Sequence, residues 1–214
     1  SLLRAYATMV TGVSKHLGTN NSGLLARVIG RRRLEHCCLQ PLSLKLRLAP
    51  SGFSPFTAGF DLLAGAVLMA VAVHRLGLQP SIGWVLSVVA YLVATLAIVV
   101  ARSYLVATMA FYAPVAAEEI SYTAIDGTLL MGTFPLSGMP LFIQIPLLTV
   151  LPEGLMAWFP SLCLLGRPPL GLTAAYPMLF AILLTLITSL VFKKGLKYYV
   201  TKGSNRYVSH ALRR

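Results

Sequence analysis

The chain has 214 residues, of which 57% are hydrophobic and 11% are Asp, Glu, Lys or Arg. Soluble domains carry about a quarter charged residues, so this composition excludes a globular protein that faces water on all sides. The net charge of +12 does not indicate a nucleic-acid-binding protein either, because fifteen of the eighteen Lys and Arg residues lie at the two ends of an apolar body.

The basic residues are sorted along the chain. Eight lie within residues 4–47 and seven within residues 193–214, and the long apolar stretch between them holds three. Because cytoplasmic loops of membrane proteins carry the excess of Lys and Arg, this distribution predicts a multi-pass protein of the cell membrane, inner or plasma, with both termini cytosolic. Arg75 falls in a turn that this orientation places outside, and it is the exception to the rule.

The N-terminal segment, residues 1–55, is predicted to be cytosolic or interfacial. Residues 1–30 are too polar to span a bilayer, so we expect an interfacial helix or the end of a longer helix. After an arginine cluster, apolar positions recur at helical spacing over residues 34–42. This amphipathic segment suits contact with a partner protein, and it equally suits a resting place on anionic lipid headgroups.

Four apolar stretches are predicted to span the membrane. The second is twenty-one residues long and carries no charge, close to the ~20 residues that cross a ~30 Å hydrocarbon core. Arg102 is expected to end it. The C-terminal residues 193–214 are expected to form a basic cytosolic tail. The transmembrane region covers residues 56–192, with spans at residues 56–75, 81–101, 103–125 and 172–192.

A further apolar stretch, residues 140–166, contains several prolines and a glutamate. Broken backbone at membrane depth is tolerated where protein or a wet cavity satisfies it, so we predict a re-entrant hairpin of two short helices on the outer side. Glu153 lies between Pro152 and Gly154, and a charge in such a place should face a cavity or pair with a cation. Arg167 is one possible partner, and these residues are candidates for an outer gate.

Asp61 lies near the start of the first span. A carboxylate at membrane depth is costly and usually faces protein or water, which makes Asp61 a candidate for a polar lining within the membrane. It is also suited to a position at headgroup level, where it would cap the helix near Thr57. The sequence leaves both interpretations open.

The order of these features resembles a known family. Residues 31–42 are similar to its cytosolic loop of the form I-R-x-G-x-L-[DE]-x-x-L-x-x-P-[LV], and residues 134–167 resemble its outer re-entrant region. Residues 192–207 are similar to its terminal pattern G-L-[KR]-x-Y-x-[ST]-x-G-[SN]-R. Over about residues 30–207, the chain resembles the membrane subunit of ABC-2 type exporters. The positions that match the loop pattern are Leu34, Glu35, Leu39, Pro41 and Leu42.

The resemblance implies an all-α polytopic fold of the ABC-2 exporter type. The family usually has six spans, and this chain resembles the last four together with the loop and the outer hairpin. The resemblance also implies that residues 34–42 form a coupling helix, and that the partners are cytosolic ABC ATPase subunits and a second permease subunit in a homo- or heterodimer. The residues expected to contact the ATPase are Arg33, Leu34, Glu35, Leu39, Pro41 and Leu42.

The sequence contains no phosphate-binding loop of the form G-x-x-x-x-G-K-[ST]. In an exporter, ATP and Mg²⁺ would therefore belong to the partner ATPase, and no cofactor, metal site or catalytic residue is expected on this chain. One alternative is a membrane anchor or assembly subunit of a larger complex, which needs no coupling segment. An intramembrane enzyme would need a convergent His, Cys or acid cluster that the sequence lacks. The apolar spans suggest an amphipathic or lipid-like substrate by analogy.

Overall fold

The structure, a computed structural model, describes residues 1–16, 55–113, 116–117, 120 and 134–202. Every regular element within these residues is helical, which confirms the predicted all-α class. The longer helices are α1 (Leu2–His16), α5 (Pro55–Arg75), α6 (Ile82–Ala107), α8 (Leu141–Thr149), α9 (Trp158–Leu164) and α10 (Tyr176–Lys202). The short 3-10 helices are η2 (Thr108–Phe111), η3 (Leu136–Gly138), η4 (Pro152–Leu155) and η5 (Pro169–Gly171).

Helix α5 is an apolar helix that ends in a glycine turn. Its outward face exposes large hydrophobic side chains, with Phe60 74% and Leu63 67% exposed, as suits contact with lipid rather than water. Gly77 adopts a left-handed φ of 63°. Its N–H donates to the carbonyl of His74, and the N–H of Leu78 donates to the carbonyl of Val73. These hydrogen bonds satisfy carbonyls of the last helical turn. The chain therefore turns sharply into α6.

Helix α6 is longer than the sequence indicates. It begins after Ser81, whose hydroxyl accepts the backbone N–H of Trp84, and it continues through Arg102 to Ala107. With η2 it forms a continuous apolar segment of 30 residues that ends at Phe111. The expected break at Arg102 is therefore wrong, and so is the start of a separate span at residue 103. The physical reason is that the Arg102 side chain has a charged partner inside the protein, so the helix does not have to end where this charge would reach water.

Three described segments are long and apolar enough to cross a membrane. They are residues 58–75, 82–111 and 176–201. The pair formed by residues 141–149 and 152–164 passes the same test only when joined, and it is bent by 73°. The stretch predicted as a hairpin thus contains α8 and α9 on either side of a sharp turn, and it counts as a fourth span only if the bent pair is taken as one.

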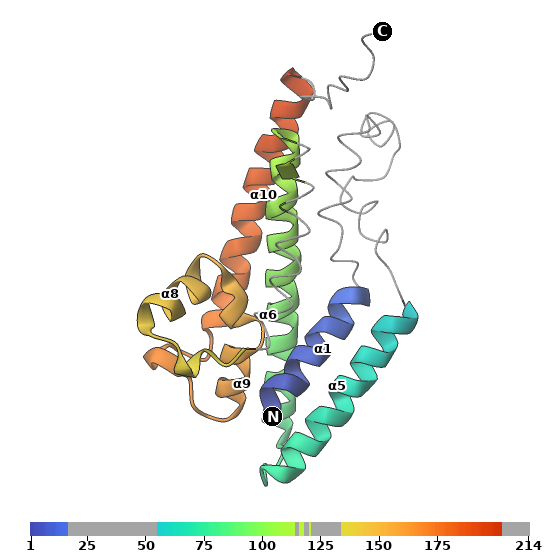
Figure 1. Ribbon diagram of the computed structural model, residues 1–214, viewed down its shortest axis with the longest axis vertical. Coiled ribbons are helices and arrows are strands. Elements are labelled where there is room, and N and C mark those ends of the chain that lie inside the picture. The colour runs from blue at the N-terminus through green and yellow to red at the C-terminus, as the bar shows by residue number, and fades with distance from the viewer. Residues whose placement is uncertain (17–54, 114–115, 118–119, 121–133, 203–214) are drawn as a thin grey trace.

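Helix α10 lies parallel to α6 (Figure 1). Near the first ends of both helices, the Tyr91 hydroxyl donates to the carbonyl of Ala174. Near their last ends, the ring of Phe111 lies 5.4 Å from that of Phe192 and 6.1 Å from that of Tyr199. The helix extends to Lys202, ten residues beyond the predicted end of the span. The basic tail therefore begins as helix, because the aromatic contacts continue past the membrane-length part.

Helix α1 is packed along α5 rather than lying apart from it (Figure 1). A Cβ atom on Gly12 would lie 2.6 Å from the backbone N of Leu62, and one on Gly65 would lie 2.6 Å from the backbone N of Met9. Small residues let membrane helices approach this closely. We call this contact the α1–α5 seam. The sequence predicted an interfacial helix or the end of a longer helix, because the polar residues of α1 argue against a span and the contact at Gly12 depends on a distant helix.

The described ends of the chain lie at opposite ends of the molecule. Ser1 lies beside the end of α5 that carries Arg75, whereas Lys202 ends α10 at the other extremity (Figure 1). The expectation that the N-terminus lies on the same side as the end of α10 does not fit the position of Ser1, whereas residues 17–54 of the N-terminal segment and the tail beyond Lys202 lie outside the described residues. It counted spans from residue 56 and omitted α1, which runs antiparallel to α5 and adds a helix to the bundle.

A buried hydrogen bond ties α1 to α6. The hydroxyls of Tyr6 and Thr95 lie 2.9 Å apart, and both residues are 0% exposed. The substitution Tyr6→Phe is expected to lower the free energy of unfolding by about 1 kcal/mol, because the ring still packs while a buried hydroxyl loses its partner. The measurement is unfolding by SDS titration in mixed micelles. If the Tyr6→Phe/Thr95→Val double variant costs the full sum of the two single variants, the hydrogen bond does not stabilise the fold.

Candidate functional site

An ion pair joins α6 to the tip of the hairpin. Arg102 Nη1 lies 2.6 Å from Glu153 Oε1, and the two side chains are 14% and 7% exposed. Hydrogen bonds between two charged groups are short and about twice as strong as neutral ones. A lone charge in an apolar bundle is costly, whereas a close pair offsets much of the cost of removing both charges from water. Arg102 and Glu153 therefore depend on each other for their buried positions.

The local sequence forces the hairpin tip inward. Pro152 occupies the first position of η4, where its fixed φ is suitable and its missing N–H breaks no helical hydrogen bond. Gly154 is in close contact with the core, since a Cβ there would lie 2.7 Å from Leu136 Cδ1 and 2.9 Å from Leu148 Cδ2. This tight packing carries Glu153, between the proline and the glycine, into the interior.

The carboxylate of Glu153 is only half satisfied. Its Oε2 atom is buried and has no hydrogen-bond partner among the described residues. A carboxylate offers two oxygens to donors, and a desolvated acceptor without a donor costs free energy. The contact between the hairpin tip and α6 thus depends on Arg102, because the Glu153 carboxylate has no other hydrogen-bond donor to its Oε2 atom among the described residues.

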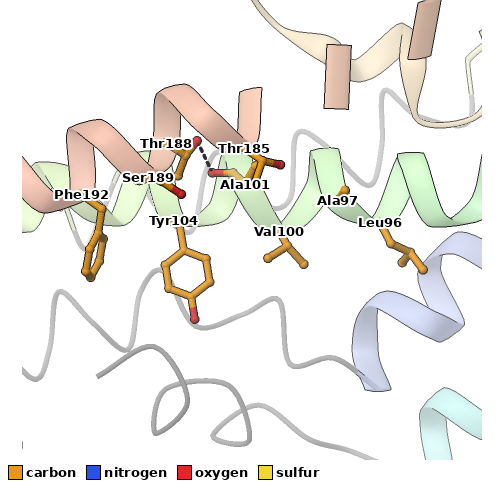
Figure 2. Close-up of a pocket in the computed structure, with 9 residues that line it drawn as sticks. All are labelled: Leu96, Ala97, Val100, Ala101, Tyr104, Thr185, Thr188, Ser189 and Phe192. Atoms are coloured by element: carbon orange, nitrogen blue, oxygen red, sulfur yellow. Dashed lines mark hydrogen bonds between the residues drawn. The ribbon is translucent and has the colours of Figure 1, made fainter. Parts of the chain in front are cut away.

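A groove of about 410 Å³ lies between α6 and α10 (Figure 2). Its α6 side includes Leu96 and Val100, and its α10 side includes Thr185 and Thr188. The Thr188 hydroxyl donates to the carbonyl of Ala101 at 3.1 Å, and this bond ties the two helices together within the groove (Figure 2). The Thr185 hydroxyl donates within its own helix. The groove therefore presents mainly apolar surface, as an alkyl chain requires.

Asp61 has a partner that neither sequence interpretation included. Its Oδ2 atom lies 2.6 Å from Nζ of Lys15, and the two side chains are 30% and 37% exposed. The pair links α5 to the last turn of α1. Because both side chains are partly exposed, the bond contributes little to stability beyond fixing the register of the α1–α5 seam.

The outer-gate candidates separate in the structure. Pro152 and Glu153 lie together at the hairpin tip, but Glu153 pairs with Arg102 and not with Arg167, the partner that the sequence offered as one possibility. Arg167 is exposed in the turn after α9, at the far end of that helix from the tip. The expected coupling segment lies outside the described residues and stays a prediction. Its residues are Arg33, Leu34, Glu35, Leu39, Pro41 and Leu42.

A family model described as an ABC-2 family transporter protein matches residues 2–203. The chain belongs to the ABC-2 transporter family. No match was found among curated proteins or among solved structures. The family match starts with α1 and ends just beyond α10, whereas the motif resemblance began near residue 30. Helix α1 is thus part of the ABC-2 membrane unit and not a separate appendage.

Two residues of this ABC-2 protein that form ion pairs in the structure were not predicted as site residues from the sequence. The hydropathy pattern predicts the end of a span at Arg102, although an arginine within an otherwise uncharged helix also indicates a buried partner. Lys15 is one of the eight basic residues of the N-terminal end, and the sequence alone gives it no specific role. Neither partner is adjacent in sequence, so no local pattern could have joined Arg102 to Glu153 or Lys15 to Asp61.

Proposed function

We propose that this ABC-2 protein is the transmembrane permease subunit of an ATP-driven exporter. The observation that carries the proposal is the family match, which extends over residues 2–203 and therefore over the whole described helical unit. ATP would be hydrolysed on separate cytosolic ATPase subunits, because the chain has no phosphate-binding loop of its own. The function of this chain would be to form the path across the membrane.

The charge distribution supports one orientation in the plasma or inner membrane. The last part of α10 exposes Lys193, Lys194 and Lys197, and Lys-rich ends favour the cytosolic side. The hairpin would then open from the outer side, with its tip reaching inward to Arg102. Two membrane subunits, identical or related, would form the complete pathway. The mainly apolar groove between α6 and α10 supports an amphipathic or lipid-like substrate.

Movement of the hairpin tip would gate the outer exit. The Arg102–Glu153 pair holds the tip against α6, and an ion pair of this kind resists the loss of one partner more than it adds net stability. A conformational cycle that separates α6 from the hairpin would have to supply other partners for both charges. Pairing at the tip therefore favours the closed exit in the resting protein.

The decisive experiment tests the coupling segment. We expect substitution of Leu34, Leu39 and Leu42 by alanine to weaken co-purification of a Walker-motif ATPase roughly tenfold or more, since a few apolar anchors carry most of the energy of a helix in a groove. The measurement combines affinity purification of the full chain from its native host with quantification of the bound ATPase and of ATP hydrolysis.

A matched control lies in the same segment of the chain. Alanine at Leu44, Leu46 and Leu48 removes the same side chains just beyond residues 34–42 and is expected to leave the complex intact. If both triple variants keep the ATPase, the coupling assignment is refuted. If the wild-type protein purifies without any ATPase but with other membrane subunits, the anchor or assembly function replaces the exporter.

A further inference from the structure

A second cavity lies at the end of the bundle opposite the lysines of α10. Its volume is about 720 Å³, within the ~300–1,000 Å³ typical of small-molecule sites. Helices α1, α5 and α9 and the segment before α8 form its walls, and they contribute Arg4, Arg75, Ser161 and Ser137. Segments that are distant in sequence thus bring these four polar side chains, together with Ser1, to one concave surface.

Two arginines give the cavity a positive charge. Arg4 comes from the start of α1 and Arg75 from the end of α5, and the antiparallel packing of these helices places both on the same cavity. Neither pairs with a carboxylate among the described residues. The two described acids, Asp61 and Glu153, are held in ion pairs with other cations. Guanidinium groups in this state suit a phosphate or carboxylate ligand.

A buried hydroxyl points to a ligand independently of the arginines. Ser161 lines the cavity, is 4% exposed, and its Oγ has no hydrogen-bond partner among the described residues. Buried hydroxyls are nearly always paired, so an unpaired one beside a cavity is suited to a bound acceptor. Nearby, the Ser137 hydroxyl accepts a hydrogen bond from Trp158 Nε1 at 3.0 Å, which leaves its own proton available to donate.

The remaining wall is apolar. Leu3, Leu162 and Leu165 line the cavity together with Trp158. A free inorganic anion would leave this surface without a partner, whereas an amphiphile places its headgroup on the arginines and its chain on the leucines. Arginines at this end are also an exception to the bias of Lys and Arg toward the cytosolic side, and a bound anion would neutralise their charge there.

We propose that this cavity binds an amphiphile with an anionic phosphate headgroup, held by Arg4 and Arg75 and by a hydrogen bond from Ser161. The chain of the amphiphile lies against the leucine wall. The site does not depend on the ATPase, so it is testable on the purified membrane protein alone, whatever the outcome for export.

The test is native mass spectrometry of the full chain in a non-ionic detergent, titrated with dioctanoyl phosphatidylglycerol. We expect a saturable 1:1 complex. The double variant Arg4→Gln/Arg75→Gln should bind roughly a hundredfold more weakly, because each charge-assisted hydrogen bond is worth about tenfold or more in affinity. Ser161→Ala should weaken binding by about threefold to tenfold without loss of folding, since it removes an unpaired buried hydroxyl.

Arg167→Gln provides the matched control. Arg167 is an exposed arginine outside the cavity, and its loss should leave the affinity unchanged. Inorganic phosphate tests the headgroup alone, and octyl glucoside tests the alkyl chain alone. Neither should saturate the site at the concentration at which the phospholipid does. Equal binding of inorganic phosphate would overturn the amphiphile assignment. Unchanged lipid affinity in the double arginine variant would overturn the site itself.

Discussion

Replacing Arg102 with methionine is expected to lower the free energy of unfolding by about 3–5 kcal/mol. The substitution keeps the length and apolar stem of the side chain but leaves Glu153 buried without its cation. The carboxylate already has one oxygen without a donor among the described residues, so no spare bond compensates for the loss. The measurement is SDS unfolding of the purified protein in mixed micelles.

Removing both charges should recover much of this loss. In the double variant Arg102→Met/Glu153→Met no uncompensated charge remains, and apolar replacements of a buried pair are often neutral. We expect the double variant to regain at least half of the free energy lost by Arg102→Met. Arg167→Gln is the control, and surface substitutions of this kind usually change stability by no more than about 0.5 kcal/mol. A single Arg102 variant as stable as the wild type would show that the pair does not hold the hairpin.

Substituting Gly65 by valine should disrupt the α1–α5 seam and destabilise the protein by about 3 kcal/mol. The new Cβ would lie 2.6 Å from both Cγ and the backbone N of Met9, so the helices must separate. A rotamer change of Met9 relieves only the first of these clashes. The readout is again the free energy of unfolding in mixed micelles.

Gly59 provides the comparison on the same helix. A Cβ there meets no atom within 4 Å, so Gly59→Ala should be neutral or stabilise the helix by up to about 1 kcal/mol. Equal effects at Gly59 and Gly65 would mean that close helix packing is not what the glycine at position 65 provides. A Gly65→Val variant with unchanged free energy of unfolding would show that the α1–α5 seam does not stabilise the protein.

The spans that the sequence predicts well are those with a continuous apolar run and a local stop. Residues 56–75 were expected and α5 runs from Pro55 to Arg75, because the apolar run, His74-Arg75 and Gly77 all act within a few residues. The predicted end of a span at Arg102 is wrong because no local signal decides it. Whether an arginine ends a helix or stays inside depends on a carboxylate that is distant in sequence, and hydropathy alone does not contain that information.

The candidate site was predictable in part. The place of Glu153 between Pro152 and Gly154 in an apolar stretch predicted that it faces a cavity or pairs with a cation, and the structure shows the pair. The identity of that cation did not follow, because it depends on how far the hairpin tip reaches along α6. The cavity at Arg4 and Arg75 could not be predicted for a similar reason, since the start of α1 and the end of α5 meet only when the two helices pack antiparallel.

The close contact of α1 and α5 has a mechanical consequence. The connection over residues 17–54 leaves α1 and returns into α5, so both of its attachment points are on the same pair of helices. With Gly12 and Gly65 bringing the two backbones together, the pair behaves as one strut. A load on the last turn of α1 or the first turn of α5 would therefore act on both helices together. The other end of the pair carries Arg4 and Arg75, so the arginine-lined cavity is formed in part by the same unit.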